Sequence, residues 1–137
     1  MLEVYEWQGE AYKPLVLTPG WMVALLNWEP IFDRANVSEV ERHNKTDEVF
    51  VLLNGKAVLF TRADGGELEA VEMMQGVVYN VPTAVWHNVV ATRDVKLLIV
   101  EDRDTHINGQ DSEHRPITAE ELAALDALLP EWAQLKS

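Results

Sequence analysis

Short apolar segments separated by turn-forming residues fill most of the first hundred positions, and this pattern constrains the fold more than any other feature. A regular succession of short strands and turns is typical of a β-sandwich or β-barrel. The sequence therefore predicts an all-β domain, with strands over residues 2–7, 21–29, 48–54, 56–62, 67–73, 77–81, 84–91 and 95–101.

The pair Asn54-Gly55 is the strongest turn signal in this region. A type I′ turn needs positive φ at both central positions, and Asn and Gly tolerate it best. This pair therefore predicts a hairpin in which residues 48–54 and 56–62 are joined by a two-residue turn.

The C-terminal region has a different pattern. Residues 102–117 contain almost no apolar side chains and indicate a solvated segment. Thr118 and Glu121 then have the spacing of a capping box, and leucines recur on one helical face until Pro130. We expect a β-barrel over residues 1–104, an acidic linker over 105–117, and a segment over 118–137 whose helix, from about 119 to 129, packs on the barrel or on a partner.

Composition excludes several classes of protein. The 137 residues include no cysteine, so neither disulfides nor a thiolate metal cluster can stabilise the fold. A net charge of -12 disfavours binding to nucleic acid. The acidic start of the chain does not resemble a signal peptide, and no apolar run approaches the roughly 20 residues that span a bilayer. We therefore expect a cytoplasmic protein that binds neither nucleic acid nor a membrane.

Two polar segments contain the residues that suggest chemistry. Alternation along a strand places Glu41 and His43 on one face, and the polar turn that follows lets Glu48 point toward the same interior. In the second segment, His87 lies on a strand that begins shortly after Pro82. The lumen of a closed barrel would bring such side chains together.

These two segments resemble the paired motifs of the cupin superfamily, G-x5-H-x-H-x(3,4)-E-x6-G and G-x5-P-x-G-x2-H-x3-N. His43 falls on the second histidine of the first motif, Glu48 on its glutamate and Gly55 on its closing glycine. His87 falls on the histidine of the second motif, five residues after Pro82. The resemblance is to small single-domain bacterial cupins and implies a double-stranded β-helix, or jelly-roll barrel.

Other positions depart from the family pattern. Glu41 stands in place of the first histidine, and Ser38 or its neighbours stand in place of the leading glycine. Ala84 replaces a glycine of the second motif, and Ala91 replaces its final asparagine. These departures bear on the affinity for metal.

The resemblance implies a divalent metal ion held by His43, Glu48 and His87, with Glu41 as a fourth candidate ligand. Two imidazoles with carboxylates suit Fe, Mn, Zn or Ni. We expect a metal-dependent enzyme of the isomerase, dioxygenase or lyase type that acts on a small polar substrate in the barrel mouth. The alternative is a metal-free cupin that binds or senses a small ligand without catalysis.

Further side chains complete the expectations. Trp86, beside His87, is the candidate substrate contact, whereas His106 and His114 lie in the polar segment and are expected to be solvated.

A small barrel must also protect the edges of its sheets. Tyr5, Trp7, Leu15 and Val16 make the N-terminal region apolar and favour a homodimer formed by strand exchange, as the cupin resemblance also implies.

Overall fold

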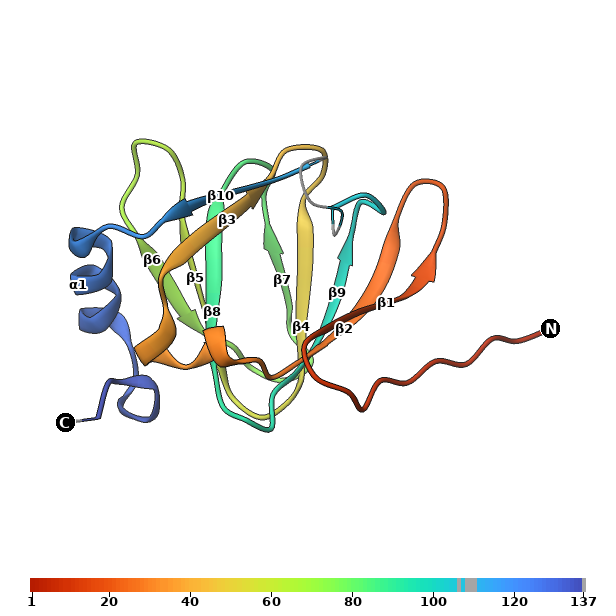
Figure 1. Cartoon of the computed structure of the whole chain (residues 1–137), viewed down its shortest axis with the longest axis horizontal. Helices are drawn as coiled ribbons and strands as arrows, with labels where there is room; N and C mark the ends of the chain where they lie inside the picture. The colour runs from red at the N-terminus through yellow and green to blue at the C-terminus, as the bar shows by residue number, and fades with distance from the viewer. Residues whose placement is uncertain (106, 108–110, 137) are drawn as a thin grey trace.

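Two five-stranded sheets face each other and enclose the core (Figure 1). The computed structural model describes residues 1–105, 107 and 111–136. The strands are β1 (Tyr12–Leu17), β2 (Met22–Asn27), β3 (Glu39–His43), β4 (Glu48–Asn54), β5 (Ala57–Arg62), β6 (Glu69–Glu72), β7 (Val78–Val81), β8 (Trp86–Ala91), β9 (Lys96–Glu101) and β10 (Ser112–Pro116). The helix is α1 (Ala119–Leu128), and short 3₁₀ turns lie at Pro30–Phe32, Arg34–Asn36 and Glu131–Ala133.

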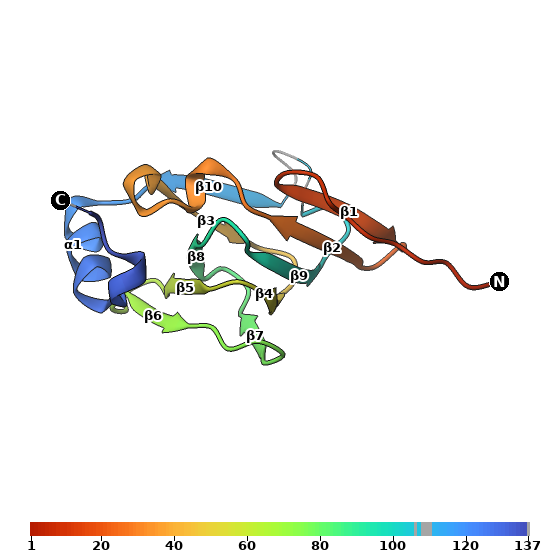
Figure 2. The same cartoon turned by 90° about the horizontal axis from the view of Figure 1, so that it is seen from below.

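The order of strands shows how the chain alternates between the sheets. One sheet has the order β1-β2-β9-β4-β7 and the other β10-β3-β8-β5-β6, with antiparallel pairing throughout both. Figure 2 shows the two sheets as layers. The predicted all-β class with a C-terminal helix is confirmed.

The core between the sheets follows from strict alternation along the strands. In β4, the inward face carries Phe50 and Leu52, both at most 3% exposed. In β9, Leu97 and Ile99 occupy the equivalent positions and are equally buried. The inward face of each strand also ends in an acidic residue, Glu48 in β4 and Glu101 in β9, so two carboxylates lie beside an apolar core.

Helix α1 covers the outer face of the second sheet. The predicted capping box is present, since the Thr118 hydroxyl accepts from the Glu121 N–H and the Glu121 carboxylate accepts from the Thr118 N–H. Leu125 is fully buried and packs in a cluster with Phe60 and Val90 from that sheet. The helix therefore packs on its own barrel and stiffens the sheet from outside.

The expected linker over 105–117 is wrong in its second half. Strand β10 lies within it and pairs with β3, from Ser112 opposite His43 to Pro116 opposite Glu39. The sequence did not predict this strand because it contains few apolar residues. As an edge strand, β10 instead makes polar contacts, through Arg115 among others. The Arg115 guanidinium donates to both carboxylate oxygens of Glu121, at 2.7 and 2.8 Å.

The expected strand over residues 2–7 is also wrong. Residues 1–6 are exposed and run away from the barrel as an extended segment (Figure 1). The chain is first held at Trp7 and Gly9, whose carbonyl oxygens accept from Asn27, with Lys96 also donating to the Trp7 carbonyl. Strand β1 is the edge strand beside β2, and residues 2–7 pair with no strand in the described part of the chain.

The predicted hairpin at Asn54-Gly55 is wrong as well, because β4 and β5 lie in different sheets. Gly55 has φ of +75°, but Asn54 is not among the residues with positive φ. The turn carries the chain from one sheet to the other and packs against the turn between β8 and β9. A Cβ on Gly55 would lie 2.9 Å from the Cα of Val95, so this close approach requires glycine.

Among the described residues, no helix is long and apolar enough to cross a membrane.

Candidate metal centre

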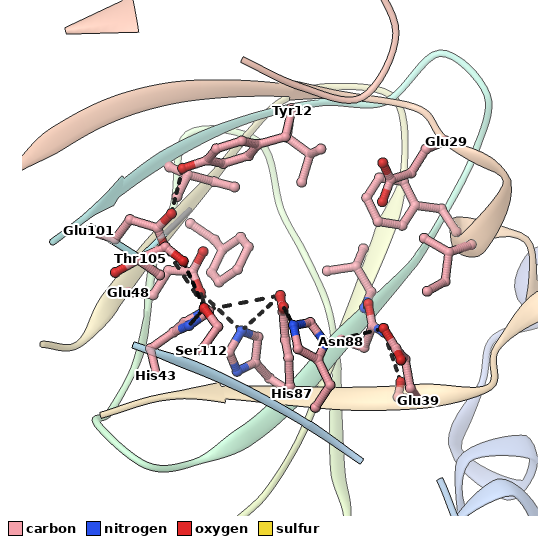
Figure 3. Close-up of a pocket in the computed structure, with 18 residues that line it drawn as sticks. Tyr12, Glu29, Glu39, His43, Glu48, His87, Asn88, Glu101, Thr105 and Ser112 are labelled. Carbon is pink, nitrogen blue, oxygen red and sulfur yellow. Dashed lines mark hydrogen bonds and ion pairs between the residues drawn. The ribbon is translucent and has the colours of Figure 1, made fainter. Parts of the chain in front are cut away.

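Strands from both sheets direct titratable side chains into one cavity of about 270 Å³ (Figure 3). Glu41 and His43 come from β3 and His87 from β8 of one sheet, while Glu48 comes from β4 and Glu101 from β9 of the other. The predicted ligands His43, Glu48 and His87 are therefore brought together, and all three are at most 6% exposed.

Glu48 lies at the centre of this cluster. Its Oε1 atom is 2.8 Å from His43 Nε2 and 3.0 Å from His87 Nε2. The remaining carboxylates stand further out. Glu41 Oε1 is 4.0 Å from His43 Nε2 and 3.8 Å from His87 Nε2, and Glu101 Oε2 is 4.0 Å from His43 Nε2.

Hydrogen bonds on the far side of each imidazole orient the two rings. The Ser112 hydroxyl donates to the Thr105 carbonyl, so its oxygen accepts from His43 Nδ1 at 2.9 Å. The Val85 carbonyl accepts from His87 Nδ1 at 3.0 Å. Both Nδ1 atoms therefore carry the proton, and both Nε2 atoms point into the cluster, which is the arrangement that metal-binding histidines usually have.

Several buried atoms in the cluster have no hydrogen-bonding partner of suitable geometry among the described residues. These are Glu48 Oε1, His87 Nε2 and Glu101 Oε2. A buried polar group without a partner costs about 1–3 kcal/mol. Glu48 Oε1 and His87 Nε2 form an ion pair at 3.0 Å without hydrogen-bond geometry, and Glu101 Oε2 lies 4.0 Å from His43 Nε2, so a group bound in the cavity would supply all three atoms with a partner.

Burial and charge compete in setting the pKa values. Burial by itself lowers the pKa of His87, but the neighbouring Glu48 outweighs it and raises that pKa to about 9. Burial likewise opposes ionisation of Glu48, yet the two histidines hold its pKa below the usual range. Burial and then the charge of Glu48 raise the pKa of Glu101 to about 10. At neutral pH the cluster thus holds protons that a dication would displace.

No protein-family model and no curated protein matches the sequence. Solved structures do match. A variant of oxalate decarboxylase from Bacillus subtilis matches at TM-score 0.56 and 12% identity, covering 87% of this chain and 33% of that one. A cupin-like protein from Thermotoga maritima matches at 0.54 and 18% identity, covering 82% and 81%. A cupin superfamily protein from Desulfitobacterium hafniense matches at 0.50 and 18% identity, covering 74% and 83%.

This protein has the cupin fold. The likeness concerns the fold alone, and the chain spans only about a third of the oxalate decarboxylase. What the cavity binds therefore depends on its own side chains.

The side chains of this cupin-fold protein fit a divalent ion. Nitrogen and oxygen ligands bind such ions at about 2.0–2.2 Å, which places adjacent ligand atoms roughly 3 Å apart. The distances of 2.8 and 3.0 Å around Glu48 Oε1 agree with that spacing. Potential ligand atoms lie within 4.8 Å of one another in two groups, Glu41 with both histidines, and His43 with Glu48 and Glu101.

Sequence reasoning missed Glu101. The signal was present, because Glu101 follows Leu97 and Ile99 on the inward face of β9 and so has the phase of a core residue. The Tyr12 hydroxyl donates to Glu101 Oε1 at 2.5 Å and holds this carboxyl against the cluster. Tyr12, from the edge strand β1, was also missed.

The prediction for Trp86 is corrected by the structure. Neighbouring residues on a strand point to opposite faces, so Trp86 faces α1 while His87 faces the cavity. Trp86 is 8% exposed and lies between the guanidinium groups of Arg42 and Arg115, at 4.4 and 4.8 Å from its ring.

The two histidines expected to be solvated have different outcomes. His114 is half exposed but lines the cavity, with its Nδ1 atom 3.2 Å from Glu39 Oε1. His106 lies outside the described residues.

Proposed function

We propose that this cupin-fold protein is a metal-dependent enzyme that acts on a small polar molecule in its cavity. The observation that carries the proposal is the group of buried atoms, without well-formed hydrogen bonds, that Glu48, His87 and Glu101 direct into one space beside His43. His43, Glu48 and His87 would hold the ion, with Glu101 and Glu41 as further candidate ligands. A divalent ion there would polarise a substrate carbonyl or activate water or dioxygen.

The protein's own groups perform three tasks in this proposal. Ser112 and the Val85 carbonyl keep the Nε2 atoms of both histidines directed inward. Tyr12 fixes the Glu101 carboxyl through Oε1 and leaves Oε2 facing the cluster. The apolar side chains that also line the cavity lower its polarity and strengthen polar interactions with a bound molecule.

Metal content is the direct test. Protein purified without chelator should contain a stoichiometric first-row divalent metal by elemental analysis, and added Fe(II), Mn(II), Ni(II) or Zn(II) should raise the melting temperature by mass action. His43→Ala and His87→Ala should remain folded and lose both effects. His114→Ala, which removes a histidine outside the cluster, is the matched control and should retain both.

The alternative function is a metal-free ligand-binding cupin, and one observation favours it. The close approach of both imidazoles to Glu48 can compensate the buried charge through ion pairs alone. In that case His43→Ala and His87→Ala would lower the melting temperature equally with and without chelator. Wild-type protein would also melt at one temperature whether metal is present or absent.

We also propose that the protein is a homodimer. Residues 1–6 carry the apolar side chains of Met1, Leu2 and Val4, each at least 83% exposed, and burial against a second copy would remove this surface from water. Light scattering should give twice the chain mass of 15.5 kDa. Deletion of residues 1–6 should give the mass of a single chain, and a monomeric wild-type protein at micromolar concentration would refute the proposal.

A further inference from the structure

The charge of the cavity wall is strongly one-sided. The acidic residues that line the cavity are Glu29, Glu39, Glu41, Glu48 and Glu101. Among the described lining residues the basic groups are three histidines, His43, His87 and His114, and there is no Lys or Arg. A divalent ion would neutralise the charge of the metal cluster, but it would leave the carboxylates at the other end of the cavity uncompensated.

Of these carboxylates, Glu29 says most about which ligand the cavity binds. It follows β2, is half-buried, and has neither a hydrogen bond nor an ion pair from its carboxylate within the described part of the chain. Burial, followed by the charge of Glu41, raises the pKa of Glu29. A positive group placed beside Glu29 would relieve both costs, since it would supply a partner and screen the two carboxylates from each other.

The position of Glu29 separates it from the metal cluster. Figure 3 shows Glu29 and Glu39 on the side of the cavity away from His43 and Glu48. The apolar side chains of Ile31 and Phe32 also line this cavity. The cavity therefore offers one end with metal ligands, another end with free negative charge, and apolar surface as well.

Glu39 adds to the negative potential at this end, whereas the Glu41 carboxylate lies within 4.0 Å of both histidines of the metal cluster. His114 contacts both carboxylates, with its Nδ1 atom 3.2 Å from Glu39 Oε1 and its Nε2 atom 3.8 Å from Glu41 Oε2. Glu29 and Glu39 outnumber this one half-exposed imidazole, so even a protonated His114 leaves net negative charge. This charge repels an anionic ligand and attracts a cationic one.

We infer that the substrate is a small organic amine whose ammonium group pairs with Glu29, while a polar group at its other end faces the metal cluster. The inference rests on the proposed function and deepens it by naming the substrate class. The volume of about 270 Å³ is below the usual range of about 300–1,000 Å³ for drug-sized ligands, which limits the amine to a small one.

A set of matched probes tests the charge preference. Aminobutanol, butanediol and hydroxybutyrate, each with its two groups at the chain ends, share a hydroxyl at one end of a four-carbon chain. The other end is an ammonium, a hydroxyl or a carboxylate, so its charge is positive, neutral or negative. Calorimetric titration of protein loaded with Zn(II) should show aminobutanol binding roughly tenfold or more tightly than butanediol, as expected for one charge-assisted hydrogen bond. Hydroxybutyrate should bind most weakly.

Variants separate the role of Glu29 from general effects of charge. Glu29→Gln should weaken aminobutanol binding roughly tenfold, leave butanediol unchanged and retain full metal content. Glu131→Gln, which neutralises an exposed glutamate near the C-terminus, is the matched control and should change neither affinity.

The outcomes distinguish this inference from the proposed function. Hydroxybutyrate binding as tightly as aminobutanol, no measurable binding of aminobutanol, or an equal loss for both probes in Glu29→Gln would each overturn the inference, while a full metal content would leave the metal proposal intact. Conversely, a preference for aminobutanol in protein that takes up no metal would refute the metal-dependent enzyme and leave the amine site in place.

Discussion

Truncation of Leu125 tests whether helix α1 stabilises the barrel without contributing to the candidate metal centre. Leu125 is fully buried against the outer face of the sheet that carries His43 and His87. Leu125→Ala removes apolar contacts and leaves a cavity that the packed cluster fills only in part, which costs about 2–5 kcal/mol. With a urea m-value of about 2 kcal/mol/M, the midpoint should fall by roughly 1–2.5 M.

Leu128→Ala is the matched control, because the same substitution on the same helix removes a side chain that is 50% exposed. It should cost less than about 1 kcal/mol. Urea unfolding followed by tryptophan fluorescence gives both values, and elemental analysis of each folded variant gives the metal content. Both variants should bind metal as the wild type does, since α1 and the cluster lie on opposite faces of the sheet. A loss of metal in Leu125→Ala while the protein stays folded would refute this separation.

Further predictions concern the backbone, the helix anchor and the cavity wall. Ala84 has φ of +66°, so Ala84→Gly should raise the free energy of unfolding by up to about 1 kcal/mol, and a lower melting temperature would contradict this. Arg115 holds the pKa of Glu121 below its usual range, so the stabilisation is complete above about pH 4.3 and is lost as pH falls toward the folded pKa. Glu121→Gln should therefore flatten the acid limb of a melting curve measured against pH, and an unchanged limb would refute the assignment. Tyr12→Phe deletes the donor to Glu101 and should cost about 1–3 kcal/mol in urea unfolding, whereas a neutral effect would show that the contact contributes nothing.

Local patterns in the sequence were sufficient for some parts of this molecule. Alternation and turn spacing predicted the all-β class, and the capping box at Thr118 predicted where α1 begins. The spacing of His43, Glu48 and His87 anticipated the residues that the fold brings together. These features succeed because side-chain alternation and helix capping depend on neighbours only a few residues apart.

Such local patterns did not predict which strands pair when they lie far apart in the sequence. Strand pairing decided that Asn54-Gly55 joins two sheets, that a polar segment forms β10, and that residues 2–7 pair with no strand among the described residues.

The candidate site shows the same division between sequence and tertiary structure. The sequence determined a β-fold with two histidines and a glutamate in phase with an interior, because a strand's face is set by local alternation. Only the tertiary structure decided that Glu101 joins them, that Trp86 faces away, and that Glu29 lines the same cavity without a partner in the part of the chain that the structure describes. Whether a polar side chain is paired, buried or free depends on which strands lie opposite it, and that arrangement results from packing of the whole chain.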